Sequence, residues 1–260
     1  MRVELLPSSV PTNAGRASPQ FLSSYLIGDS LVIDGGSVGL LADVDRQLAV
    51  RHVFLTHAHL DHVASLPFLI ENAYTPGPDC IEVLASPAVL AQINADLFNG
   101  RTWPDFLSLS TPQNTFMRAT PIEPLQTVER AGFRITPVPV SHSGDTLGMI
   151  VDDGSSCVAF AADTGPTDQI WRQLATRPTL TAVFLECSFP NSMEDLATKT
   201  GHLCPRTFAT QRARLTDRVK VFAVHRKARY ADEIARELAI GLGVARLPVQ
   251  IIVPEGADVV

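Results

Sequence analysis

The stretch Thr56-His57-Ala58-His59-Leu60-Asp61-His62 follows a short apolar run and determines how the rest of the chain is interpreted. It has the pattern H-x-H-x-D-H, which places three imidazoles and one carboxylate within six positions. In an extended segment, residues two apart point to the same side, so His57 and His59 can bind one cation together. Asp61 and His62 follow where the chain should turn, and they can face a second cation. Nitrogen and carboxylate ligands suit zinc, iron or manganese. A polar loop with scattered histidines is the alternative interpretation.

The composition is that of a folded globular chain. Its 260 residues are 45% hydrophobic, which allows a substantial core, and no linker divides them, so we expect a single domain over 1–260. The net charge is -6, whereas nucleic-acid surfaces usually need a basic face. We therefore expect no nucleic-acid partner. A small anionic substrate at a metal centre remains possible, because local charge decides its binding.

Targeting signals are not visible in the sequence. Residues 1–7 contain no long apolar segment of the kind that a secretory signal has. No apolar run reaches the roughly 18 residues that a membrane span needs. The four cysteines lie far apart without a C-x-x-C pattern, which indicates free thiols in a reducing compartment. We expect a cytoplasmic protein without a membrane partner.

Apolar periodicity predicts strands alternating with helices. An edge strand and a loop are expected within residues 1–20, and a long ordered loop over 101–127. The expected strands cover 23–27, 31–34, 53–55, 133–140, 148–151, 157–161, 182–185, 219–224 and 249–253. The expected helices cover 38–50, 62–73, 168–175, 205–215 and 230–238, and one more begins at Ser86-Pro87.

Candidate ligands outside the motif also follow predicted strands. His142 follows the strand that ends at Val140, Asp163 follows the second strand of a hairpin, and His225 follows Val224. Strand ends at the edge of a sheet are rigid positions on which a metal site can be built. His52 precedes its strand, and a surface or structural role fits it better.

These motifs, taken in order, resemble those of the metallo-β-lactamase superfamily: H-x-H-x-D-H, a lone His, a bridging Asp and a late His, over roughly residues 20 to 253. The resemblance implies an α+β fold, a four-layer αββα sandwich with a dinuclear site at one edge of its two sheets. It implies two divalent ions, with zinc favoured and manganese or iron as alternatives. One ion would be bound by His57, His59 and His142, the other by Asp61, His62 and His225, and Asp163 would bridge them.

A narrower resemblance is to the class II cyclic nucleotide phosphodiesterases. It is carried by Asp163-Thr164-Gly165, Trp171, Glu186 to Asn191, Thr200-Gly201-His202-Leu203, and Asn99 to Phe106 with Trp103-Pro104. It implies hydrolysis of 3′,5′-cyclic AMP or GMP to the 5′-monophosphate, and it suggests a homodimer. The stretch Val221 to Lys227 departs from the usual pattern, which leaves the substrate more open than the metal site.

Residue chemistry suggests how such a reaction would proceed. Two cations can share a water and lower its pKa toward roughly 7, so hydroxide would attack phosphorus opposite the 3′ oxygen. Asp61 and His202 are the expected catalytic residues. His202 would protonate the leaving oxygen or contact the phosphate, since an ordinary imidazole pKa near 6.5 suits proton donation. The alternative for His202 is a capping or surface role.

Other side chains have two interpretations each. Trp103 could stack on the base of a substrate or simply pack, and Lys227 could attract the phosphate or be a solvated charge. Asp34 could support a ligand imidazole or end a turn, and Glu186 is a plausible acceptor for a ligand imidazole.

Three other functions remain open. The first is another hydrolase on the same fold, acting on a lactone, thioester or sulfate ester. The second is a nuclease that trims RNA 3′ ends, which the acidic balance argues against. The third is a binding module without activity, which is disfavoured because all seven ligand positions are filled.

Overall fold

The structure is a computed structural model, and it describes residues 1–6 and 22–241. The strands of this part of the chain form two mixed sheets, each with six strands. In the first sheet the order is β1-β2-β3-β4-β5-β6, and in the second it is β12-β11-β10-β9-β8-β7. The first sheet contains β1 (Val3–Leu5), β2 (Tyr25–Ile27), β3 (Leu31–Ile33), β4 (His52–Phe54), β5 (Ile81–Ala85) and β6 (Met117–Pro121). The second contains β7 (Val128–Arg130), β8 (Phe133–Pro139), β9 (Leu147–Asp152), β10 (Cys157–Phe160), β11 (Leu180–Glu186) and β12 (Lys220–Val224).

Both sheets combine an antiparallel part with a parallel part. In the first, β1, β2 and β3 pair antiparallel, and β3 to β6 pair parallel. In the second, β7 to β10 pair antiparallel, and β10, β11 and β12 pair parallel. Parallel neighbours end at the same edge of a sheet, so side chains that follow these strands are brought together.

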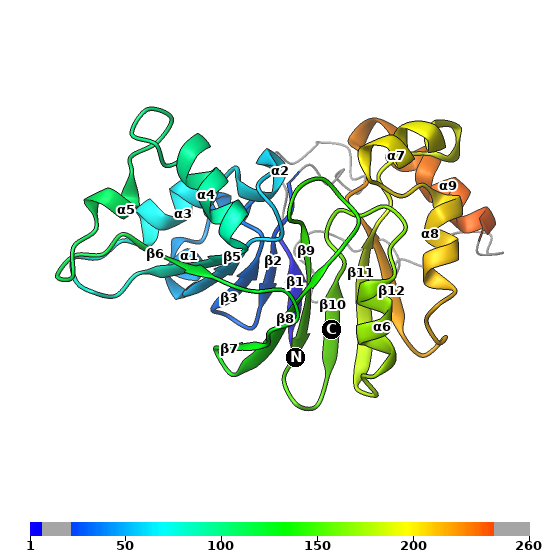
Figure 1. Cartoon of the computed structure of the whole chain (residues 1–260), viewed down its shortest axis with the longest axis horizontal. Helices are drawn as coiled ribbons and strands as arrows, with labels where there is room; N and C mark the ends of the chain where they lie inside the picture. Colours follow the sequence, from blue (N-terminus) through cyan, green and yellow to red (C-terminus); the bar gives the residue numbers. More distant parts are fainter. Residues whose placement is uncertain (7–21, 242–260) are drawn as a thin grey trace.

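Helices cover the outer face of each sheet. Figure 1 shows α3, α4 and α5 on one side of the molecule and α6, α8 and α9 on the other. The helices are α1 (Val44–Ala49), α2 (Leu60–Val63), α3 (Leu66–Ala73), α4 (Pro87–Asp96), α5 (Phe106–Leu109), α6 (Gln169–Ala175), α7 (Glu194–Thr200), α8 (Pro205–Arg212) and α9 (Ala231–Gly241). Short 3₁₀ turns cover Val38–Leu40, Asn191–Met193 and Ala228–Tyr230.

Three apolar clusters hold these layers together, one between the sheets and one under each helical layer. Strand β4 and its continuation show how the sequence produces this arrangement. Phe54 belongs to the cluster between the sheets, while Val53 and Leu55 belong to the cluster under the helices. A strand that is buried on both faces reads as a continuous apolar run, because successive side chains point to opposite faces. The predicted four-layer αββα sandwich is confirmed.

Several predicted elements differ from the structure. The helix expected over 38–50 is a 3₁₀ turn and the separate helix α1, because the Asp43 carboxylate accepts from the Asp45 amide and starts α1 anew. The helix expected over 62–73 is divided into α2 and α3. At the break, the Ser65 hydroxyl donates to the Gly35 carbonyl and accepts from the Gly39 amide.

The segment 101–127 is more regular than the sequence predicted. It contains α5, whose first turn is capped by the Asp105 carboxylate accepting from the Ser108 amide. It also contains β6, which pairs with β5 and ends at Pro121. Proline is tolerated there because β6 is an edge strand. The prediction of a long loop was wrong for these two elements.

The remaining predicted elements have two outcomes. The edge strand near the N-terminus is confirmed as β1, whereas β5, β7 and α7 were not predicted. The strand expected over 249–253 and the loop before residue 20 lie outside the described residues. Between Tyr25 and Gly241, and in the short N-terminal piece, no helix has both the length and the apolar character needed to cross a bilayer.

Candidate metal centre

The predicted metal ligands lie together where the strands of both sheets end. His57 follows β4, His142 follows β8, Asp163 follows β10, and His225 comes directly after β12. Three groups of side chains could each hold a metal ion, and within each group the ligand atoms lie within 4.8 Å of one another. The first is His57, His59, His142 and Asp163, the second is Asp61, His62 and His225, and the third, which shares two members with these, is Asp163, His202 and His225. The structure thus brings together all seven residues that the sequence singled out.

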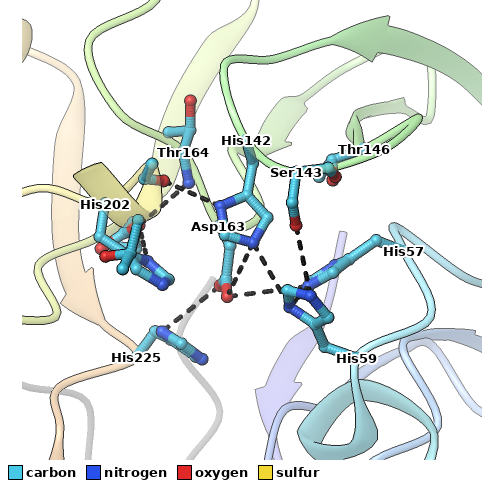
Figure 2. Close-up of polar contacts among 12 residues, drawn as sticks. His57, His59, His142, Ser143, Thr146, Asp163, Thr164, His202 and His225 are labelled. Carbon is cyan, nitrogen blue, oxygen red and sulfur yellow. Dashed lines mark hydrogen bonds and ion pairs between the residues drawn. The ribbon is translucent and has the colours of Figure 1, made fainter. Parts of the chain in front are cut away.

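In the first group, imidazole nitrogens surround one oxygen of Asp163. The His57 and His142 Nε2 atoms lie 3.8 and 4.0 Å from Asp163 Oδ2. The Nδ1 atom of His59 lies 3.0 Å from His57 Nε2 and 3.4 Å from His142 Nε2. Figure 2 shows these rings on one side of the Asp163 carboxylate, with His225 and His202 on the other.

The second group approaches the other oxygen of the same carboxylate. Asp163 Oδ1 lies 3.5 Å from His62 Nε2 and 3.3 Å from His225 Nδ1. Asp61 Oδ2 lies 3.0 Å from His225 Nε2. Asp163 therefore stands between the two groups, as a carboxylate that bridges two cations would.

Each of the five imidazoles has one nitrogen fixed by a neighbour outside the two groups. Such a contact sets the orientation of the ring and directs the other nitrogen toward a metal ion. The contacts are His57 Nδ1 with Thr56 Oγ1 (3.0 Å), His59 Nε2 with Ser143 Oγ (3.2 Å), His62 Nδ1 with Asp34 Oδ2 (2.7 Å), His142 Nδ1 with the Gly201 carbonyl (2.9 Å) and His225 Nδ1 with Ser188 Oγ (2.9 Å).

The donor set fits divalent metal ions. The His62 Nε2 atom is buried and has no hydrogen-bond partner in the part of the chain that the structure describes. The contacts of Asp163 with His57, His62 and His142 span 3.5–4.0 Å, which exceeds a good hydrogen bond. When two ligand atoms each lie about 2.0–2.2 Å from a shared ion, the distance between the two ligand atoms falls in roughly this range.

Electrostatics at the site favour neutral imidazoles in the first ligand group and an ionised carboxylate at Asp163. Burial and the charge of His62 lower the pKa of His57 to about 2. Burial also lowers the pKa values of His59 and His142. Burial would raise the pKa of Asp163, but the charges of His225 and His62 hold it well below its usual value. Neutral imidazole and ionised carboxylate are the forms that bind metal.

His62 is the exception among these imidazoles. Burial alone would lower the pKa of His62, but the carboxylates of Asp163 and Asp34 on either side raise it well above its usual value. A protonated ring nitrogen cannot be a ligand, so a cation that binds here would displace a proton.

Three residues next to the cluster adopt positive φ although they are not glycine: Asp34 (62°), Ala162 (56°) and His225 (56°). Such conformations cost on the order of 1–3 kcal/mol each and persist where the surrounding structure enforces them. Ala162 directly precedes Asp163, and Asp34 contacts His62. The strain is therefore concentrated on the backbone that aims the candidate ligands.

Gly201 has to be a glycine for two reasons. It ends α7 with φ of 69°, in the left-handed region that favours glycine. A Cβ atom at this position would lie 3.0 Å from Nδ1 of His142, the ring that its carbonyl holds. A side chain here would displace a candidate ligand.

His202 lies beside the cluster, and its ring is held by the carboxylate of Glu186. Its Nδ1 atom lies 2.6 Å from Glu186 Oε1, and the Glu186 side chain is fully buried at the end of β11. Glu186 also accepts from the amides of Thr164, Ser188 and Leu203, so the carboxylate is rigidly held. Burial alone would lower the pKa of His202, but the hydrogen bond and charge of Glu186 raise it above its usual value.

Other predicted residues have definite surroundings. Asp34 does contact a candidate ligand, and it also accepts from the Thr56 amide. The Lys227 Nζ atom lies 3.9 Å from Asp61 Oδ2, and its side chain is partly exposed. Trp103 packs edge-to-face on Phe68 at 5.2 Å. The roles of Lys227 and Trp103 in substrate binding stay predictions, as do the ligand roles of the seven residues.

Sequence reasoning missed the partners that orient the rings, namely Ser143, Ser188 and the Gly201 carbonyl as a hydrogen-bond acceptor. Ser143 and Ser188 each lie within two residues of a residue that the sequence had singled out, His142 and Glu186. A search for hydroxyl side chains next to candidate ligands would have found them. His52 is structural, as expected, and its Nδ1 atom lies 3.0 Å from Glu82.

Comparison with known proteins agrees with this geometry. The family model described as the beta-lactamase superfamily domain matches residues 40–226, which include all seven candidate ligands. The chain belongs to the metallo-β-lactamase superfamily. The metallo-beta-lactamase fold protein YhfI from Bacillus subtilis has a similar structure, with a TM-score of 0.68 at 20% identity, covering 92% of this chain and 91% of that protein.

Two curated relatives are similar in sequence. A probable 3′,5′-cyclic-nucleotide phosphodiesterase from Yersinia pestis is 29% identical over 234 residues, covering 74% of this chain and 66% of that protein. A 3′,5′-cyclic-nucleotide phosphodiesterase from Aliivibrio fischeri is 26% identical over 188 residues, covering 65% of this chain and 54% of that protein. The matched regions thus span about two thirds and about half of these relatives.

Proposed function

We propose that this metallo-β-lactamase superfamily hydrolase cleaves 3′,5′-cyclic nucleotides to 5′-monophosphates with two divalent ions, of which zinc fits the ligands best. The observation that carries the proposal is the Asp163 carboxylate standing between two groups of histidine and aspartate ligand atoms. The names of the two curated relatives support the choice of substrate. We also propose that the chain is one domain and that it acts in the cytoplasm as a homodimer, on a small molecule rather than a nucleic acid.

The ions and the protein divide the chemistry. Two bound divalent ions supply Lewis acidity that activates water and positive charge that neutralises the phosphate oxygens. His57, His59 and His142 would hold one ion, Asp61, His62 and His225 the other, and Asp163 both. The fixed orientation of each ring lets the site bind ions without rearranging, which is what a preorganised electrostatic site requires.

The surroundings of His202 support a role in protonating the leaving group. Glu186 holds its Nδ1 atom at 2.6 Å, which leaves Nε2 as the atom that can donate a proton. Cleavage of the bond between phosphorus and the 3′ oxygen creates an alkoxide that must be protonated. The raised pKa favours the protonated form of His202, which is the form that a general acid needs. The Lys227 ammonium, 3.9 Å from Asp61 Oδ2, would attract the anionic phosphate of the substrate.

The test is a product analysis with zinc-loaded protein. The protein should convert 3′,5′-cAMP or 3′,5′-cGMP to the 5′-monophosphate, identified by chromatography against both monophosphate standards. In water labelled with heavy oxygen, one label should enter the phosphate and none the ribose. Asp163→Asn protein prepared in parallel is the control for a contaminating phosphodiesterase, and it should give no product.

Two results would contradict the proposal. A 3′-monophosphate would show that the 5′ oxygen is the leaving group and would overturn the orientation. No turnover of either cyclic nucleotide, with two ions bound and a lactone, thioester, sulfate ester or RNA 3′ end cleaved instead, would assign the chain to another reaction of the superfamily.

A further inference from the structure

An exposed apolar strip begins at the metal centre and is not used in the mechanism above. It consists of Leu60, Ala64 and Phe68, with Trp103 beside Phe68. Leu60 is 71% exposed and Phe68 is 40% exposed, which is unusual for large apolar side chains beside a polar site. Trp103 supports Phe68 by an edge-to-face contact with ring centroids 5.2 Å apart.

The strip starts next to two candidate metal ligands. Leu60 stands between His59, in the first ligand group, and Asp61, in the second. Leu60 begins α2, Ala64 directly follows it, and Phe68 lies in the first turn of α3, so four residues separate each of these side chains from the next along the chain. Figure 1 shows α2 at the same end of the molecule as α7, which precedes the His202 loop.

The chemistry of the strip selects one kind of occupant. A group that covers Leu60 has to be joined closely to the atoms that the ions hold, because Leu60 is flanked by candidate ligands. The strip offers apolar and aromatic surface and no charged side chain. A nucleobase meets both conditions, since it is a flat aromatic ring connected to the cyclic phosphate through one sugar. Stacking of a base on an aromatic surface depends on its face, which every base has, and not on its hydrogen-bonding edge.

We propose that the strip formed by Leu60, Ala64, Phe68 and Trp103 binds the base of the cyclic nucleotide by its face. This inference rests on the proposed function and adds the basis of substrate selection to it. It follows that cAMP and cGMP are turned over with similar kcat/KM. It also follows that the smaller pyrimidine ring of 3′,5′-cyclic CMP gives a higher KM.

The experiment compares Leu60→Ala and Phe68→Ser with wild-type protein on two substrates. The first is cAMP, and the second is methyl ribofuranoside 3′,5′-cyclic phosphate, which keeps the sugar and the cyclic ester but has a methoxy group in place of the base. Both positions are exposed, so the substitutions leave the core intact. Leu125→Ala is the matched control, because Leu125 is 43% exposed and lies in the connection between β6 and β7.

On cAMP, each strip variant should raise KM about 5- to 50-fold with kcat within about twofold, since stacking on the strip is lost from the bound substrate and the transition state alike. On the base-free substrate, wild-type and variants should be equal. Leu125→Ala should match wild-type protein on both.

Three results would overturn the inference while leaving the proposed function intact. The first is unchanged KM for cAMP in both strip variants of an active enzyme. The second is an equal loss on both substrates, which would place the effect in the metal centre. The third is a shift from dimer to monomer in size-exclusion chromatography without any change in KM, which would make the strip a contact between two copies. Absence of turnover of both cAMP and cGMP by the wild-type protein would instead reject the proposed function.

Discussion

Glu82 in β5 and Asp163 after β10 are both buried carboxylates, yet their surroundings differ. Glu82 accepts hydrogen bonds from Arg130 Nε and Nη2 at 2.7 and 2.9 Å and from the Thr120 hydroxyl at 2.7 Å, and one imidazole, His52, also contacts it. Among the described residues, the ion-pair contacts of Asp163 are with imidazoles, at 3.3–4.0 Å. Arg130 lies on β7 of the second sheet, so the Glu82 contact also joins the two sheets.

The difference lies in where the neutralising charge comes from. Arginine is a permanent cation whose planar group matches a carboxylate, so Glu82 is balanced within the chain. Imidazoles are neutral or charged according to their surroundings, and burial keeps His57 and His142 from being protonated. The charge of His62, whose pKa Asp163 and Asp34 raise, balances Asp163 in part, and a bound cation would take over that role. We therefore expect Glu82 to be structural and Asp163 to bind metal.

The largest effect should come from removing the charge of the bridging carboxylate. Asp163→Asn keeps the shape of the side chain, but it should reduce bound zinc from about two ions per chain to less than one and lower turnover by more than about 10⁴-fold. His142→Ala should weaken mainly one of the two sites. Elemental analysis of the dialysed protein gives the zinc content of both variants. Glu82→Gln removes the same charge from the other carboxylate and should leave the zinc content unchanged. Two tightly held ions in Asp163→Asn would show that this residue does not bridge.

The next effect concerns His202, which has a carboxylate partner of its own. His202→Ala should lower kcat by roughly 10²–10⁴-fold, the range for loss of a general acid, while the zinc content stays at the wild-type value. His52→Ala is the matched control, because His52 also contacts a buried glutamate, Glu82, but lies outside the cluster. Near-wild-type kcat in His202→Ala would make the residue structural.

A smaller loss is expected at Asp34, which orients His62 from outside the ligand groups. Asp34→Asn should weaken zinc binding about 10- to 100-fold, as is usual when the partner of a ligand histidine is changed. Asparagine tolerates the positive φ of this position, so the backbone should not be disturbed. Competition with a chelator gives the affinity of each ion. Equal affinities in wild-type and variant protein would show that the Asp34 contact does not support the site.

The proximity of the seven candidate ligands could be predicted from the sequence because most of its signal is local. The H-x-H-x-D-H motif supplies four candidates in six positions, and His142, Asp163 and His225 each follow an apolar strand. The ring partners could not be predicted in the same way. Gly201 meets His142 across 59 positions and Ser188 meets His225 across 37, so only the folded chain brings them together.

The same reasoning explains the elements that were missed. Strand β6 has a weak pattern of its own and is fixed by pairing with β5, more than thirty residues earlier in the chain. The break between α2 and α3 depends on Ser65 bonding to Gly35 and Gly39, which lie before the motif. Long-range contacts therefore decided what local periodicity left open.

The smallest effect on function, and the largest on stability, should come from Glu82. Hydrogen bonds from Arg130 hold the pKa of Glu82 at about 2, below its usual value of 4.5. The ionised form is thus preferred in the folded chain, and its contribution to stability is present above pH 4.5 and is lost as the pH falls toward 2. Glu82→Gln should lower the free energy of unfolding by about 1–3 kcal/mol at pH 7, with unchanged kcat and zinc content.

Denaturant unfolding at several pH values can test whether the stability contribution of Glu82 is lost as the pH falls. The difference between wild-type and Glu82→Gln protein should be constant from pH 7 to about 5 and should shrink below pH 4.5. Glu129→Gln is the matched control, since Glu129 is an exposed neighbour of Arg130 on β7. A difference that grew toward low pH would mean that Glu82 is stabilised in its protonated form. In that case a buried carboxylate bonded to arginine would not be balanced within the chain, and the contrast with Asp163 would fail.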